Sequence, residues 1–205
     1  MGNLVITIGR QFGSGGSEVG KMVAEKMGIK LYDKELINLA AKQSGLSEHI
    51  LEDYDEKPTN SFLYSLSLGA YSLDSAIAGV PNMPIVDKVF MVQSQIIREI
   101  AEKEPCVIIG RCAESVLKEH DSLLSVFIHS DIENRIDRIC NEKGITRAAA
   151  ADLIKKTDKK RASYHNYFAE GRWGDAAAYD ICLDSKMGIE HIARIIQYCA
   201  ENKLF

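Results

Sequence analysis

The chain has 205 residues, which is enough for one well-buried core and short for two domains of ordinary size. Hydrophobic residues make up 46% of it and charged residues 26%, a balance that is typical of globular proteins and argues against disorder. The net charge of -4 excludes a general attraction to nucleic acid or to an anionic membrane, so an anionic ligand needs a local group of donors.

The chain begins with a pattern of strand, glycine-rich turn and helix. Residues 4–8 form a short apolar run that predicts a buried strand. Residues 17–27 place Val19, Val23 and Met27 on one stripe of a helix, and Gly28 supplies the stop. A second, weaker strand is predicted over residues 30–32.

Residues 34–104 separate this beginning from the next predicted strand, and they read as a mixture of helix and loop. A simple crossover between parallel strands needs far fewer residues. We therefore predict a helical subdomain inserted over the carboxyl ends of the strands, where open α/β sheets bind their ligands. Within it, the apolar content of residues 62–80 predicts a homodimer contact.

The second half of the chain alternates between strands and helices. Residues 106–109 and 124–128 are apolar on both faces, as parallel strands covered by helices are, and residues 179–183 form a weaker strand. Asp131 is expected to cap a helix that ends near Gly144, and Thr146 a helix that continues to about residue 167. A closing helix is predicted over residues 188–199. The whole chain thus predicts a single α/β domain with a doubly wound, five-stranded parallel sheet.

Residues 9–17 read GRQFGSGGS and have the context of a phosphate-binding loop, because a strand precedes them and a helix follows. Glycines permit positive φ angles, so consecutive backbone N–H groups can turn toward an anion, and the helix N-terminus adds its dipole. Ser17 stands in the first helical turn, where a hydroxyl can bind a phosphate or a magnesium ion. A glycine-rich turn without a ligand is the plainer alternative.

The loop departs from the pattern G-x-x-x-x-G-K-[ST] at the position of the lysine. With Ser17 in the final position, Gly16 stands where a lysine would reach the β- and γ-phosphates. We expect Arg10 to replace it, because its guanidinium can fold back over the phosphates. Lys21 lies one helical turn further on and is expected to point away. The loop alone therefore favours binding over catalysis.

The cysteines, the amino terminus and the apolar stretches predict a cytoplasmic protein. The five cysteines include no C-x-x-C pair, which predicts neither a disulfide framework nor a zinc site, and reduced thiols fit a cytosolic protein. The amino terminus lacks the pattern of a signal peptide, and no stretch reads as a membrane span.

Three segments resemble the cytidylate kinase-like family of bacterial proteins, in the correct order and over nearly the whole chain. They read ITIGRQFGSGGSEVGKMVAEKMGIKLYDKELI, then VIIGRCAESVL, then TDKKRASYHNYF followed by GRWGDAAAYDICLDS. The resemblance implies a fold of the P-loop kinase type with a core over residues 1–33 and 105–205. The insertion would then bind a nucleoside monophosphate, and residues of about 150–175 would form a helical lid.

The resemblance also implies an activity and its residues. The activity is phosphoryl transfer from ATP to a nucleoside monophosphate, CMP or dCMP, with Mg²⁺. Asp33 and Arg111 would contact the acceptor, and Asp158 belongs to the lid. Arg161 and Arg172 are the candidate lid arginines for the charged transition state, although a basic run such as residues 156–161 is more often a solvated helix face. The donor phosphates would be held by Gly13, Ser14, Gly15, Gly16 and Ser17, with Ser17 on the metal.

Two other functions fit the same residues. The missing lysine suggests a nucleotide-binding sensor or regulator that has lost catalysis. Departures from true cytidylate kinases, such as Cys112 after the acceptor arginine, suggest a kinase of another small acceptor.

Overall fold

The computed structural model describes residues 2–33 and 84–205. Five parallel strands form one sheet in the order β2-β3-β1-β4-β5, which confirms the predicted fold class. β1 lies in the centre, where its Ile8 is paired with Ile109 of β3 and with Val126 of β4. All six residues of β1 are buried, as expected for a strand covered on both faces. The strands are β1 Val5–Arg10, β2 Lys30–Tyr32, β3 Cys106–Ile109, β4 Leu123–His129 and β5 Ile181–Asp184.

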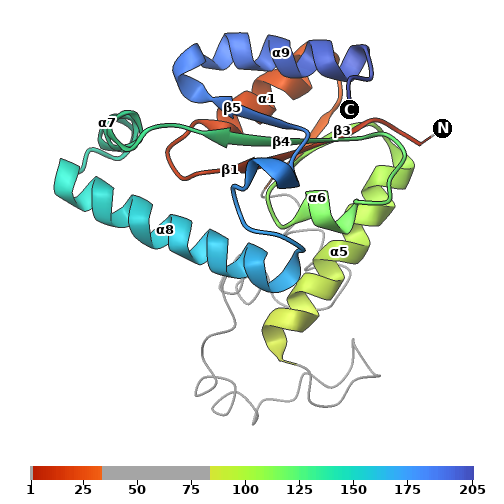
Figure 1. The fold of residues 1–205 in the computed structure, drawn as a ribbon, viewed down its shortest axis with the longest axis horizontal. Coiled ribbons are helices and arrows are strands. Elements are labelled where there is room, and N and C mark those ends of the chain that lie inside the picture. Colours follow the sequence, from red (N-terminus) through yellow and green to blue (C-terminus); the bar gives the residue numbers. More distant parts are fainter. Residues whose placement is uncertain (1, 34–83) are drawn as a thin grey trace.

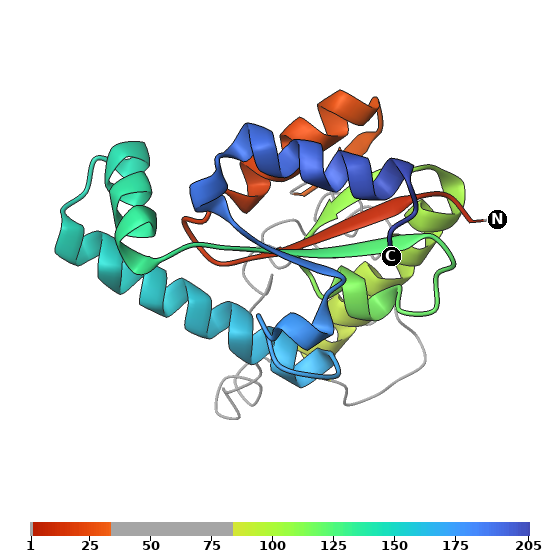
Figure 2. The same cartoon turned by 45° about the horizontal axis from the view of Figure 1, so that its top comes forward.

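Helices cover both faces of the sheet and form a three-layer arrangement (Figure 1). The helices α1 Gly16–Met27 and α9 Ile189–Glu201 pack together on one face (Figure 2). On the other face lie α5 Ile85–Lys103, α6 Ala113–Val116 and α8 Arg147–Phe168. The remaining elements are α7 Ile132–Lys143 and the short 3₁₀ helices η1 Ala176–Ala178 and η2 Ser185–Met187.

The ends of the predicted helices are set by the residues expected to set them. The Asp131 carboxylate accepts a hydrogen bond from the backbone N–H of Asn134 at 2.9 Å and so caps α7. Gly144 ends α7 in the left-handed conformation, and Gly28 ends α1 in the same way. The hydroxyl of Thr146 caps α8 in turn.

α8 spans the molecule as a bridge that is buried only near its two ends. Of its 22 residues, Ala150 and Ile154 are buried toward the first end, and Tyr164 and His165 toward the second. The first pair belongs to an apolar cluster with α7. At the second end Phe90 of α5 packs against α8, stacked on Phe168 with 4.0 Å between ring centroids. The polar middle of α8 therefore crosses the carboxyl edge of the sheet between two fixed ends.

The structure adds detail within the predicted insertion. α5 lies inside the range 34–104, yet Val89, Ile96 and Ile97 are buried in the same apolar cluster as Val5 and Ile108 of the sheet. α5 is thus part of the core layer. The rest of the predicted insertion, including the homodimer contact at 62–80, lies outside the described residues. Among residues 2–33 and 84–205 no helix is long and apolar enough to cross a membrane.

Candidate active site

The phosphate loop (residues 9–17) has the backbone conformation that its glycines predict. Gly13 and Gly15 adopt φ angles of 76° and 80°, a region that side chains with a Cβ rarely occupy. Gly15 is also the residue before α1, and no side chain caps that helix. The first-turn N–H groups of α1 therefore point toward the loop and are available to an anion.

The loop is held to the end of β4 by hydrogen bonds. The N–H of Gln11 donates to the carbonyl of Ile128 at 3.0 Å, and the Gln11 side-chain oxygen accepts from the N–H of Ser130 at 3.1 Å. Ser14 is fully buried, and its hydroxyl lies 2.8 Å from the Gln11 carbonyl. The predicted phosphate-binding role of Ser14 is therefore limited to its backbone, because its side chain points into the protein.

Arg10 occupies the space beside Gly16. A Cβ atom placed on Gly16 would lie 2.5 Å from the Cβ of Arg10 and 3.0 Å from its Cγ. Real Cβ atoms do not approach so closely, so no side chain fits at position 16 while Arg10 keeps its place. Only 8% of Arg10 is exposed, and its stem runs past the residue that stands in the lysine position. Arg10, which was expected to replace the lysine missing at position 16, thus lies directly beside Gly16.

Asp158 connects the α7–α8 hairpin to the phosphate loop. One carboxylate oxygen accepts from the backbone N–H of Phe12 at 2.8 Å, and the other pairs with the Arg135 guanidinium. Arg135 also donates to the Phe12 carbonyl at 3.3 Å, and the Phe12 ring packs against the apolar cluster between α7 and α8. Both carboxylate oxygens are therefore engaged within the protein, which suits a residue that positions the loop rather than one that contacts substrate.

Arg161 lies on the polar middle of α8 and reaches the same loop. Its guanidinium donates to the carbonyl of Arg10 at 3.3 Å and lies 5.7 Å from the centre of the Phe12 ring. This is a cation–π contact as well as a hydrogen bond. The predicted lid arginine is therefore beside the phosphate loop.

Arg111 and Asp33, the two residues expected at the acceptor, form an ion pair. Nη1 of Arg111 lies 3.3 Å from Asp33 Oδ1 and 2.9 Å from the Ile109 carbonyl. Gly110, Arg111 and Cys112 follow β3 in succession with φ angles of 71°, 57° and 55°. Two non-glycine residues in this region store backbone strain, which concentrates at functional sites.

A small cavity of about 20 Å³ is lined by Arg10, Arg111 and Arg161, and we call it the arginine cavity. Glu114 and His165 line it too, and His165 Nε2 lies 2.9 Å from Glu114 Oε1. Burial, and then the negative charge of Glu114, raise the pKa of the Tyr179 phenol, so that this group stays neutral. The cavity is lined by Gly9, Arg10, Gly110, Arg111, Cys112, Glu114, Arg161, Tyr164, His165, Trp173 and Tyr179.

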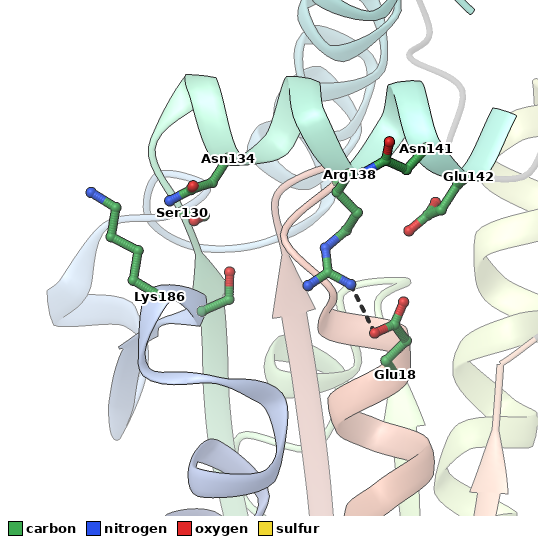
Figure 3. Close-up of a pocket in the computed structure, with 9 residues that line it drawn as sticks. Glu18, Ser130, Asn134, Arg138, Asn141, Glu142 and Lys186 are labelled. Carbon is green, nitrogen blue, oxygen red and sulfur yellow. Dashed lines mark hydrogen bonds and ion pairs between the residues drawn. The ribbon is translucent and has the colours of Figure 1, made fainter. Parts of the chain in front are cut away.

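A larger cavity of about 540 Å³ is lined by residues of the phosphate loop, α1 and α7 (Figure 3). Arg138 of α7 points across it to Glu18 of α1, and their charged groups are 2.8 Å apart. The Arg138 guanidinium also lies close to the loop, because a Cβ on Gly15 would be 3.1 Å from its Cζ. The other lining residues are Gly13, Ser130, Asn134, Asn141, Glu142, Ser185 and Lys186.

The two remaining predicted residues lie at the surface. Ser17 is exposed in the first turn of α1. Arg172 is exposed in the segment between α8 and η1 and does not line either cavity. The structure therefore groups Arg10, Arg111 and Arg161 and leaves Arg172 apart.

Sequence reasoning missed Arg138, Glu114 and His165. The helical pattern of α7 was clear, but its apolar stripe does not tell which of its polar residues faces the loop. Glu114 lies within a short helix that no periodicity signals, since α6 has four residues. His165 lies among the aromatic residues near the end of α8, and no motif in the sequence marks it as the partner of a carboxylate.

Comparison with known proteins gives three kinds of match. The model of a family described as "Cytidylate kinase-like family" matches residues 5–187. A protein named cytidylate kinase, from Archaeoglobus fulgidus, is 26% identical over 204 residues, which cover 97% of this chain and 95% of that protein.

Solved structures match over nearly the whole chain as well. An uncharacterized protein from Eubacterium ventriosum is 29% identical with a TM-score of 0.70, and the match covers 97% of this chain and 99% of that one. A shikimate kinase from Bacteroides thetaiotaomicron has 14% identity and a TM-score of 0.55, and the match covers 97% of this chain and 98% of that one. At that identity the likeness concerns the fold alone, which is that of P-loop kinases.

Proposed function

Because the chain belongs to the cytidylate kinase-like family, we propose that it is a kinase that transfers the γ-phosphoryl group of ATP to CMP or dCMP. The observation that carries the proposal is the meeting of Arg10, Arg111 and Arg161 in one cavity beside the phosphate loop. Phosphoryl transfer needs positioning and positive charge around the moving group more than it needs covalent chemistry. Three guanidinium groups with fixed surroundings supply both.

In this proposal the donor lies on the side of the 540 Å³ cavity, whose volume is in the range of small-molecule sites. The phosphates of ATP would follow the backbone N–H groups of residues 13–17, and Arg138 would contact them from α7. The nucleoside would lie in the cavity near Asn134 and Lys186. The Lys186 ammonium pairs with Asp131, which fixes it at the cavity wall.

Arg10 takes the part of the missing lysine. Its stem fills the space that a side chain at position 16 would occupy, and Arg10 lines the arginine cavity beside the loop. A guanidinium can bind two phosphate oxygens at once, whereas an ammonium binds as a point charge. Arg10 would therefore stabilise the charge that develops on the transferred group.

The donor set of the loop fits a magnesium ion. Ser17 offers an exposed hydroxyl oxygen in the first turn of α1, and oxygen is the ligand that Mg²⁺ prefers. When bound, Mg²⁺ would neutralise charge on the donor phosphates. Ser17 would hold it together with phosphate oxygens of the nucleotide.

The acceptor would lie toward β3 and α8. Arg111 is fixed by Asp33 and by the Ile109 carbonyl, so its guanidinium is oriented before an acceptor binds. Arg161 reaches the same cavity from α8. A nucleoside monophosphate carries a dianionic phosphate that can engage both, and the sheet edge between them is the usual ligand site of such folds.

The test is ADP formation from ATP and Mg²⁺ across a panel of nucleoside monophosphates, with an acceptor-free control. Stimulation by CMP or dCMP above the other nucleotides would support the proposal. ATP binding without stimulation by any acceptor would favour the second candidate, a nucleotide-binding regulator. The observation that favours this candidate is the glycine at position 16, where a catalytic lysine is expected. Stimulation by a non-nucleotide acceptor alone would point to a kinase of another metabolite.

A further inference from the structure

We propose that Glu114 and His165 form a positioning pair that sets the spacing between Arg111 and Arg161 across the arginine cavity. The inference rests on the proposed function, since it concerns how the acceptor side of that site is held. Neither residue belongs to the phosphate loop, and the phosphoryl-transfer account above gives neither a role.

The pair is a buried hydrogen bond between two elements. His165 Nε2 lies 2.9 Å from Glu114 Oε1, with 6% and 9% of the two side chains exposed. The carboxylate accepts, so Nε2 carries the proton. The opposite nitrogen, Nδ1, is buried and has no hydrogen-bond partner among residues 2–33 and 84–205. The contact with Glu114 is therefore the polar anchor of this histidine, and buried polar groups lose stability when such a partner is removed.

Each member of the pair is tied to one of the arginines. Arg161 precedes His165 by four residues on α8, and residues at this spacing lie on the same face of a helix. Arg111 precedes Glu114 by three residues, through the left-handed turn that opens α6. All four residues line the arginine cavity. The hydrogen bond thus joins the two segments that carry the two arginines.

The way α8 is buried makes the hydrogen bond between Glu114 and His165 important for the position of Arg161. α8 is buried near its ends, and Arg161 lies on the part that bridges them. At the far end Tyr164 packs on Phe90 of α5, with 6.2 Å between ring centroids, which holds the helix against α5. The Glu114–His165 bond holds the same turn against α6. Without it, α8 can shift along α5, and the distance from Arg161 to Arg111 is no longer fixed.

The experiment compares two replacements of His165 that differ in reach. His165→Gln keeps a nitrogen near the position of Nε2 and can still donate to Glu114, whereas the side chain of His165→Asn is too short. We expect H165N and E114A to lower kcat/KM for the acceptor roughly tenfold to a hundredfold, the scale of a small misplacement of catalytic groups. KM for ATP should change less than twofold. H165Q should recover most of the loss, and H191N, at an exposed histidine of α9, serves as the matched control.

A double-mutant cycle separates positioning from general destabilisation. If His165 acts through Arg161, the acceptor effect of H165N should largely disappear in an R161A background. Full additivity, equal damage in H165Q and H165N, or normal acceptor kinetics in both E114A and H165N would each overturn the proposal. Thermal unfolding identifies variants that fail to fold, and H165Q then carries the comparison.

Binding distinguishes the failure of this inference from the failure of the proposed function. Trp173 is the single tryptophan of the chain and lines the arginine cavity, so its fluorescence can report CMP binding without turnover. A wild-type chain that binds CMP but transfers no phosphoryl group contradicts the proposed function alone. The weaker binding expected for H165N and its recovery in H165Q still test the pair. If the wild type neither binds CMP nor transfers a phosphoryl group to it, both proposals fall.

Discussion

At the scale of single residues, the loop differs most from an ordinary phosphate loop in the use of Arg10 in place of the lysine. We predict that Arg10→Ala lowers kcat by roughly a hundredfold or more, the effect of removing one donor to a transition-state charge. Arg10→Lys should recover only part of this, because the ammonium cannot bind two oxygens. Steady-state kinetics checks the prediction, with Arg98→Ala on the exposed face of α5 as the control. Equal rates for R10A and R98A would remove Arg10 from the mechanism.

Gly16 gives a second prediction, which concerns the missing lysine. Gly16→Lys should reduce activity rather than restore it, because the new Cβ would meet Arg10 at 2.5 Å. We expect a loss of stability of about 1–3 kcal/mol, the usual cost of overpacking a tight site. Gly28→Ala, which has open space but a φ of 64°, separates the cost of a clash from that of backbone strain. Chemical denaturation and the kinase assay measure both variants, and a G16K protein more active than the wild type would contradict the account.

Cys106 allows a prediction about pH. Burial in the sheet raises the pKa of its thiol to about 12 from an ordinary value of 9.0, so the folded state holds its proton over a range where the unfolded state loses it. The stability that this contributes is fully present below about pH 9 and is lost as the pH rises toward 12. In the native protein Cys106 should resist iodoacetamide at pH 8.5 and react after unfolding. Mass spectrometry of alkylated peptides checks this, and rapid native labelling of Cys106 would show that the strand opens.

At the scale of elements, the α7–α8 hairpin and the phosphate loop act as one unit. Asp158 and Arg135 form an ion pair with 17% and 9% of their side chains exposed, and both hold the backbone of Phe12. These contacts attach the hairpin to the phosphate loop through the backbone of a single residue, Phe12.

Asp158→Asn tests this coupling. The change should cost about 3 kcal/mol of stability, because it leaves Arg135 buried without its counter-charge. It should also weaken ATP binding, since the N–H of Phe12 loses its charged acceptor. Asp152→Asn, at an exposed position on the same helix, is the matched control. If D158N and D152N bound ATP equally well, the hairpin would have no part in shaping the loop.

At the scale of the whole molecule, most of the fold could be predicted from the sequence, because the strands are short apolar runs with clear ends. Asp131 and Thr146 cap the beginnings of α7 and α8, and Gly28 ends α1, as predicted. α6 was not predicted, because four residues are too few to show a helical period. The core role of α5 was hidden for another reason, since its pattern was read as part of a long insertion.

The candidate site was predicted where one motif is continuous in sequence. The phosphate loop was predicted from its glycine-rich turn between a strand and a helix, whereas Arg111 and Arg161 were predicted from the resemblance to the family. Arg138 and the Glu114–His165 pair join elements that are far apart in the chain. Such contacts depend on how α7 and α8 pack, which a single sequence does not specify.

The proposed reaction is phosphoryl transfer by a family member in which glycine stands in place of the loop lysine. The most direct test follows label from γ-³²P ATP in the presence of Mg²⁺ and CMP, with the products separated by thin-layer chromatography. The account predicts labelled CDP that forms only when CMP is present. Label that stays in ATP, or that appears only as inorganic phosphate at a rate independent of CMP, would contradict it.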